Sequence, residues 1–171
     1  MSMSSSSPSR GGADGASPTE ARPYLEETTL VRVRFNEVDA LHVVWHGHYV
    51  NYFEEARRAF GRRYGIDYTV FLEHHLAVPV VQLRVDYLAP ARLPDLLEVT
   101  ARLSKSEAAR LDFDYEIRRQ GEGTLLATGS TVQVFATPQG ELLLTWPALM
   151  VERLKAWEAL WRHPQPSPTS R

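Results

Sequence analysis

The residues best placed for chemistry lie between Asn36 and Arg57, where a predicted turn leads into a predicted helix. Asp39 lies in that turn, so its carboxylate is expected near the helix N-terminus. Backbone N–H groups there lack intrahelical acceptors, carry partial positive charge and can polarise a carbonyl oxygen. A carboxylate beside them can act on the carbonyl carbon, as a nucleophile or through a water molecule. The alternative is structural, because a turn aspartate often caps the helix that follows.

Two histidines lie close to this aspartate. His46 lies at the N-terminus of the predicted helix. Its imidazole could assist a leaving group or an attacking water, or it could simply pack there. Gly47 follows it and would allow a substrate to approach the backbone closely. His42 lies four residues before His46, but both fall in a predicted loop without an evident third ligand, so no metal site is expected.

Aromatic and charged residues around the helix complete the candidate site. Trp45 and Tyr49 could line a substrate pocket, although packing in the core explains them equally well. Glu54 and Arg57 are three residues apart, a spacing that makes them neighbours on a helix and favours a structural ion pair. The alternative is that Glu54 orients a water molecule or a neighbouring loop.

Hydrophobic periodicity predicts the elements that hold these residues. The segment Thr28–Phe35 alternates between apolar and polar side chains, which indicates a half-buried strand. The helix is expected over His48–Tyr64, where apolar residues recur every three or four positions, and Gly65 would end it. Asp67 would cap a further helical segment at 67–74.

A run of strands follows with only short connections. Alternation and turn residues predict strands at Val80–Leu88, Leu96–Leu103, Leu111–Arg119 and Thr124–Thr137, with Glu141–Thr145 extending the sheet. A last helix is expected from Pro147. Short connections favour antiparallel pairing, and the predicted helix is the available cover for one-faced strands. The fold class is therefore α+β, an antiparallel sheet around a central helix with a C-terminal helix.

Length and composition fit one cytoplasmic domain. The 171 residues carry a net charge of −2, so no basic field suggests nucleic acid or an anionic membrane as a partner. The absence of cysteine excludes disulfides and thiol catalysis. There is no secretory signal, and no apolar run approaches the ~20 residues of a membrane span. Composition predicts disordered tails at 1–23 and 163–171 around a domain at 24–162.

Two segments of the chain carry a family signature. The first comprises DALHVVWH at Asp39–His46, then Tyr49, then FEEAR at Phe53–Arg57; the second is VDYLAPARLPD at Val85–Asp95. Together they resemble the 4-hydroxybenzoyl-CoA thioesterase family, whose relatives include the YbgC-type acyl-CoA thioesterases. The likeness runs over about 29–157. It implies a hotdog fold, in which a sheet curls round a central helix, and a homodimer formed by pairing sheet edges, often doubled to a homotetramer.

The resemblance also implies roles for individual residues. Asp39 falls on the family's catalytic carboxylate, and His46 falls where a backbone N–H receives the thioester oxygen. The family commonly has glycine three residues after the aspartate, whereas this chain has His42. If that position requires φ > 0, either His42 is strained or the loop differs from the family's.

Binding of CoA would need cations for its phosphate groups. The family's basic residues lie in and near the turn between the second and third long strands, where this chain offers Lys105 and Arg110. Glu107 stands about where YbgC-like members carry arginine, so the match is imperfect. The alternative is an ordinary solvated hairpin.

The resemblance implies an acyl-CoA thioesterase that hydrolyses a short-chain or aromatic acyl-CoA to free acid and CoA, without a cofactor. An acyl-carrier-protein thioester is the alternative substrate. Two other functions remain open. One is a hydratase-dehydratase of the same fold, which would act on enoyl or hydroxyacyl thioesters with a histidine and a carboxylate. The other is a non-catalytic module that binds acyl thioesters.

Overall fold

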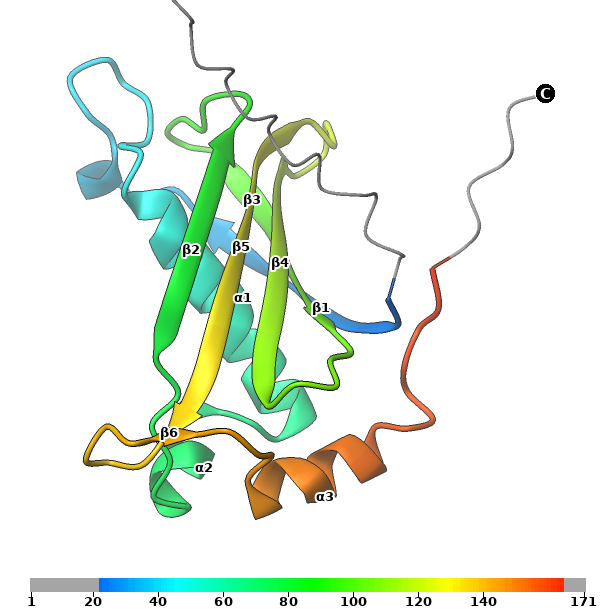
Figure 1. Ribbon diagram of the computed structural model, residues 1–171. Helices are drawn as coiled ribbons and strands as arrows, with labels where there is room; N and C mark the ends of the chain where they lie inside the picture. The colour runs from blue at the N-terminus through cyan, green and yellow to red at the C-terminus, as the bar shows by residue number, and fades with distance from the viewer. Residues whose placement is uncertain (1–21, 165–171) are drawn as a thin grey trace, which may run out of the picture.

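The computed structural model describes residues 22–164, which form one antiparallel sheet packed against a long helix (Figure 1). The strands are β1 (Tyr24–Arg32), β2 (Val80–Tyr87), β3 (Leu96–Ser104), β4 (Arg110–Arg119), β5 (Leu125–Ala136) and β6 (Leu142–Leu143). Their order is β1-β3-β4-β5-β2, and β6 pairs with the end of β5. β1 and β2 are therefore the outer strands of the main sheet.

The helices are η1 (Phe35–Glu37), α1 (His48–Tyr64), α2 (Tyr68–Glu73) and α3 (Ala148–Ala156). The predicted bounds of α1 are confirmed, and Gly65 ends it in the left-handed conformation with φ 71°. Asp67 caps α2, as predicted, because its side chain accepts the N–H of Tyr68 at 2.6 Å. At the end of α1, the carbonyl of Tyr64 accepts the indole N–H of Trp157, the residue that follows α3, at 3.2 Å.

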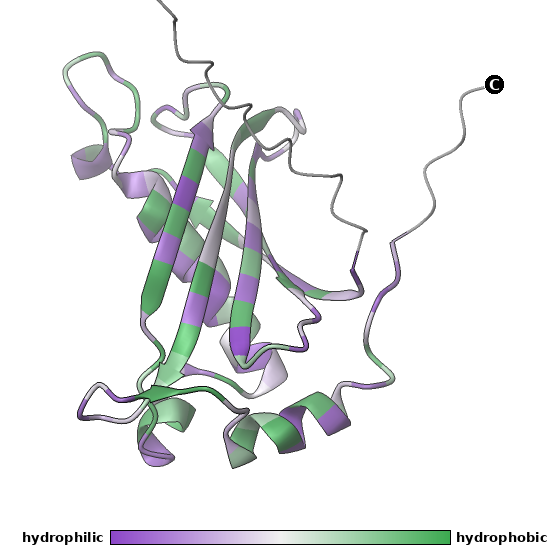
Figure 2. Cartoon of the chain, in the orientation of Figure 1, coloured by the Kyte–Doolittle hydropathy of each residue, from purple (hydrophilic) through white to green (hydrophobic). Residues whose placement is uncertain are grey.

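The core lies between α1 and the sheet. Phe53 stacks on Tyr115 with ring centroids 4.5 Å apart, and Phe60 meets Phe113 edge-on at 5.1 Å. A Cβ at Gly129 would lie 2.4 Å from the Phe53 ring, so glycine is needed there for α1 to approach the sheet. Hydropathy alternates along β2 and β4 (Figure 2), which leaves the outer face of the sheet polar.

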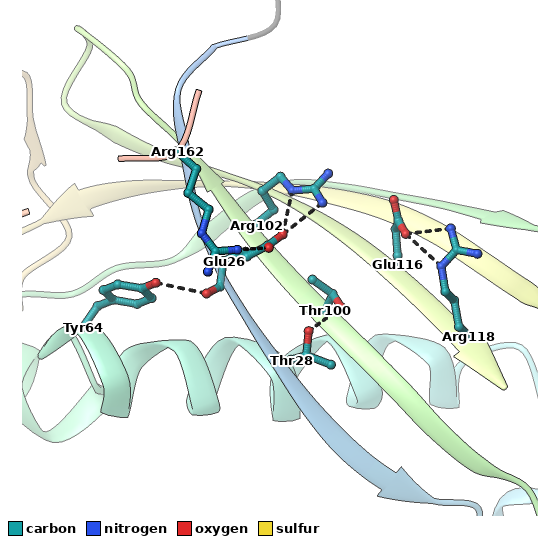
Figure 3. Close-up of polar contacts among 8 residues, drawn as sticks. All are labelled: Glu26, Thr28, Tyr64, Thr100, Arg102, Glu116, Arg118 and Arg162. Carbon is teal, nitrogen blue, oxygen red and sulfur yellow. Dashed lines mark hydrogen bonds and ion pairs between the residues drawn. The ribbon is translucent and has the colours of Figure 1, made fainter. Parts of the chain in front are cut away.

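The first strand is shifted toward the N-terminus relative to the predicted Thr28–Phe35. Its early part is polar, but those side chains have partners on β3. Glu26 pairs with Arg102 at 3.0 Å, and the hydroxyls of Thr28 and Thr100 lie 2.7 Å apart (Figure 3). Apolar alternation therefore does not mark where this strand begins. The predicted end of the strand instead forms η1.

Most of the two predicted tails, 1–23 and 163–171, lies outside the described residues. Pro23, at the end of the first, accepts the N–H of Lys105 on its carbonyl at 2.7 Å. The predicted strand at Glu141–Thr145 is reduced to the short β6. Among residues 22–164, no helix combines the length and apolar character needed to cross a membrane.

Candidate active site

Asp39 lies in a tight loop between η1 and α1. Its backbone N–H donates to the carbonyl of Val43 at 2.9 Å, and its own carbonyl accepts the N–H of His42 at 2.9 Å. The carboxylate oxygen Oδ1 accepts the N–H of Leu41 at 2.8 Å, so the side chain stabilises its own turn and does not cap α1. The other oxygen, Oδ2, has no hydrogen-bond donor within the described chain. It is free to act on a ligand.

A short antiparallel bridge brings Asp39 to the start of α1. Val38 pairs with Val44, and the N–H of Trp45 donates to the carbonyl of Glu37 at 2.9 Å. After η1 the chain therefore turns at Asp39 and runs back antiparallel to itself, so that α1 begins close to the end of η1. The carboxylate and the helix N-terminus lie at the same end of the molecule.

In the part of the chain that the structure describes, no side chain caps the N-terminus of α1. The N–H of His48 donates to the carbonyl of Trp45 at 2.9 Å, whereas the N–H groups of His46 and Gly47 have no acceptor among residues 22–164. Such N–H groups favour negative charge on a nearby oxygen. A Cβ at Gly47 would come within 1.9 Å of the Trp45 indole, so this ring fills the space beside the glycine.

A buried glutamate holds the loop to the helix, and sequence reasoning missed it. Glu37 is only 6% exposed, and its Oε2 accepts the N–H of Arg34 and the hydroxyl of Tyr52, both at 2.8 Å. Burial first, and then the hydrogen bond to Glu37, raise the pKa of Tyr52. The phenol therefore stays protonated and continues to donate. The available sequence signal is a glutamate at the third position of a short helical turn, where it can complete a capping box.

The second signature segment packs against the first. The N–H of Val44 donates to the carbonyl of Ala91 at 2.9 Å, and the N–H of Ala91 donates to the hydroxyl of Tyr49 at 3.0 Å. Tyr49 is buried, and its burial raises its pKa. It therefore packs in the core and supports the loop, which is the structural alternative for this residue.

His46 is exposed among aromatic rings. The Trp45 ring, also exposed, lies with its centroid 4.5 Å from the imidazole, and Tyr87 meets the imidazole edge-on at 6.5 Å. The hydroxyl of Tyr87 donates to the carbonyl of His46 at 2.9 Å. In the described part of the chain, no three His, Cys, Asp or Glu side chains cluster as metal ligands.

The backbone at His42 meets the condition under which strain is predicted. This residue has φ 58°, in the left-handed region that favours glycine. We expect His42→Gly to raise the free energy of unfolding by about 0.5–1 kcal/mol, because it removes the Cβ clash while making the unfolded chain more flexible. Thermal unfolding followed by circular dichroism measures the change.

The control for this prediction is His42→Ala. That substitution removes the imidazole but keeps the Cβ, so it should not stabilise the protein. If His42→Gly melted at or below the wild-type temperature, the backbone conformation at this position would not be a source of strain.

The predicted CoA-binding residues lie far from Asp39 within one chain. β1 ends at Arg32 opposite Leu96, whereas the 105–110 turn follows the other end of β3. Nine residues of strand separate the two ends by about 26 Å. Lys105 pairs with Glu158 at 3.1 Å, and Arg110 pairs with Asp112 at 3.0 Å. One subunit does not bring these cations to the carboxylate.

A large cavity of about 1170 Å³ lies between α1, α2 and the ends of β2 and β5. Glu54 and Arg57 form the predicted ion pair on its wall. Val80, at the start of β2, also lines it, so the cavity is at the opposite end of β2 from Tyr87. The apolar part of its lining includes Phe71, Leu72, Leu76, Val78 and Phe113.

Comparisons with known proteins give a consistent family. The family model of the thioesterase-like superfamily matches residues 33–157. The chain is 34% identical over 113 residues to acyl-CoA thioesterase YbgC of Haemophilus influenzae, covering 66% of this chain and 81% of that protein. It is 32% identical over 108 residues to acyl-CoA thioester hydrolase YbgC of Escherichia coli O6:H1, covering 63% and 80%.

Solved structures with similar folds include thioesterases. A DHNA-CoA thioesterase from Staphylococcus aureus has a TM-score of 0.71 and 25% identity, over 79% of this chain and 92% of that one. A mutant of 4-hydroxybenzoyl CoA thioesterase, complexed with 4-hydroxybenzoyl CoA, has a TM-score of 0.65 over 75% and 97% of the two chains. At 19% identity it bears on the fold alone. The predicted hotdog fold is confirmed by these neighbours.

Proposed function

Because the chain belongs to the thioesterase-like superfamily, we propose that it hydrolyses the thioester of a short-chain or aromatic acyl-CoA to a free acid and CoA. The predicted enzyme class, a thioester hydrolase, is confirmed by its relatives. One observation carries the proposed chemistry. Among residues 22–164, a carboxylate oxygen of Asp39 without a donor lies at the same end of α1 as N–H groups without acceptors. These groups complement the carbon and oxygen of one carbonyl.

In the proposed reaction the thioester oxygen accepts the backbone N–H of His46, with the N–H of Gly47 beside it. Asp39 either attacks the carbonyl carbon to form an acyl anhydride that water then hydrolyses, or removes a proton from an attacking water. Both routes break the C–S bond, release CoA as a thiolate and consume one water. A thiolate leaves readily, so the His46 imidazole is assigned only an assisting role.

We further propose a homodimer formed through β2. This strand is at the edge of the main sheet, yet Val81, Leu83 and Tyr87 are 54%, 48% and 49% exposed. An apolar edge strand with free N–H and C=O groups invites pairing with another chain. Antiparallel pairing about a two-fold axis would satisfy those groups, and two such dimers would make the homotetramer that the family resemblance implies.

This pairing would join opposite ends of the two subunits. Tyr87 lies beside His46 at one end of β2, and Val80 lines the large cavity at the other. Antiparallel pairing would place the partner subunit's Val80 near Tyr87, so the cavity of one subunit would face the Asp39 loop of the other. We assign that cavity to the acyl group, with the exposed Trp45 at its entrance. The 105–110 turn of the subunit that provides the cavity would then bind the CoA phosphates.

The direct test is a screen of the purified protein against acetyl-, butyryl-, hexanoyl-, palmitoyl-, benzoyl- and phenylacetyl-CoA, with free thiol measured colorimetrically. We expect turnover of the short-chain or the aromatic group. A 3-hydroxyacyl product formed from an enoyl thioester without free CoA would instead support the hydratase. If a folded protein that binds CoA released no thiol from any thioester, that result would support the binding module.

A further inference from the structure

We propose that Tyr87 holds the oxyanion-binding backbone in its productive orientation, a positioning role that rests on the proposed function. Its hydroxyl, at the end of the edge strand β2, donates to the carbonyl of His46 at 2.9 Å. The two residues are 41 positions apart, so this bond ties the sheet to the start of α1. It acts on the backbone and leaves the reacting atoms to other groups.

The bond fixes the plane of a peptide group. In a trans peptide the C=O and N–H lie in one plane and point in opposite directions, so a partner for the carbonyl also sets the direction of the N–H. The carbonyl of Trp45 accepts the N–H of His48 at 2.9 Å, which directs the N–H of His46. The carbonyl of His46 accepts the hydroxyl of Tyr87, which directs the N–H of Gly47.

The second of these planes is held through Tyr87. Within residues 22–164, the carbonyl of His46 has no other donor. Loss of this bond would leave the plane without a hydrogen bond on its carbonyl side to oppose rotation. Rotation would turn the Gly47 N–H away from the thioester oxygen and the His46 carbonyl toward it. Attraction for the developing negative charge would be replaced by repulsion.

Tyr87 is itself firmly held. Its backbone pairs with Ala127 in β5, and its ring lies edge-on against Tyr49 with centroids 5.1 Å apart. The hydroxyl of Tyr49 in turn accepts the N–H of Ala91 at 3.0 Å. Phenylalanine at position 87 would keep the ring contacts with Tyr49 and with the His46 imidazole, and would remove only the hydroxyl that binds the His46 carbonyl.

The kinetic test compares Tyr87→Phe with a matched variant, Tyr64→Phe. Tyr64 also donates its hydroxyl to a backbone carbonyl, that of Glu26 at 3.0 Å, but near the other end of α1 (Figure 3). We expect Tyr87→Phe to lower kcat about tenfold to a hundredfold with KM within about twofold, because the lost effect belongs to the transition state. Tyr64→Phe should leave kcat within about twofold of the wild type.

A spectroscopic test reads the peptide group directly. His46–Gly47 is the only His-Gly pair in the sequence, so labelling histidine carbonyls with 13C and glycine nitrogens with 15N selects this one peptide by NMR. In Tyr87→Phe we expect changed 13C and 15N shifts, because the carbonyl loses its hydrogen-bond donor. The same signal should be unchanged in Tyr64→Phe.

Each outcome decides the proposal. Lower kcat at constant KM together with a changed His46–Gly47 signal supports it. Full activity of Tyr87→Phe, or an unchanged signal, overturns it, as does an equal loss of kcat in both variants. A wild-type protein inactive on every thioester would reject the proposed function itself, which is a different result from an active wild type with an equally active Tyr87→Phe.

Discussion

An Asp39→Asn variant is expected to lose at least about a thousandfold in kcat while it folds and binds substrate normally. The amide oxygen of asparagine can still accept the N–H of Leu41, which Asp39 Oδ1 accepts at 2.8 Å, so the loop keeps its shape. The amide is neither a nucleophile nor a base toward a thioester or a water molecule. Steady-state kinetics on the best acyl-CoA of the screen measures the loss.

Asp114→Asn makes the same chemical change away from the site. Asp114 lies on β4 between Phe113 and Tyr115, which pack on the α1 side, so its side chain is on the outer face of the sheet. Its variant should keep wild-type kinetics. If Asp39→Asn also kept the wild-type rate, Asp39 would not be the catalytic group, and its carboxylate would serve only the turn.

The central helix could be predicted to its last residue, whereas the first strand could not. The signals of α1 are local, since its apolar residues repeat within the helix and Gly65 ends it. The early part of β1 is stabilised by partners more than seventy positions away. The carboxylate of Glu26 is paired with Arg102, and the hydroxyl of Thr28 is hydrogen-bonded to that of Thr100. Neither pairing is visible in a window of sequence, because cross-strand contacts decide where a strand forms.

The same distinction separates the parts of the site. The position of Asp39 before a helix follows from the order of residues, so its place at the helix end could be predicted. The burial of Glu37 could not, because it depends on Tyr52, fifteen positions later, folding back onto it. Family position alone predicts Lys105 and Arg110 as phosphate ligands, but the direction of β3 places them at one end of a strand about 26 Å long, whereas β1 leads toward the Asp39 loop at the other end.

This distance leads to the second prediction, that two defective chains can restore an active site together. One chain carries Asp39→Asn, and the other carries Lys105→Gln with Arg110→Gln. The double substitution should lower kcat/KM about tenfold to a hundredfold through lost phosphate contacts. It should spare the fold, since the partly exposed ion pairs of Lys105 and Arg110 contribute little stability.

If each site combines Asp39 of one subunit with the cations of the other, a mixed dimer has one site with every defect and one with none. Mixed dimers isolated with two affinity tags should then show about half of the wild-type kcat/KM, as two-fold symmetry requires. The matched control puts all three substitutions in one chain and pairs it with a wild-type chain. Both of its sites are then damaged, so it should be nearly inactive. The reverse result, an active control and inactive mixed dimers, would place the carboxylate and the cations in one subunit and contradict the composite site.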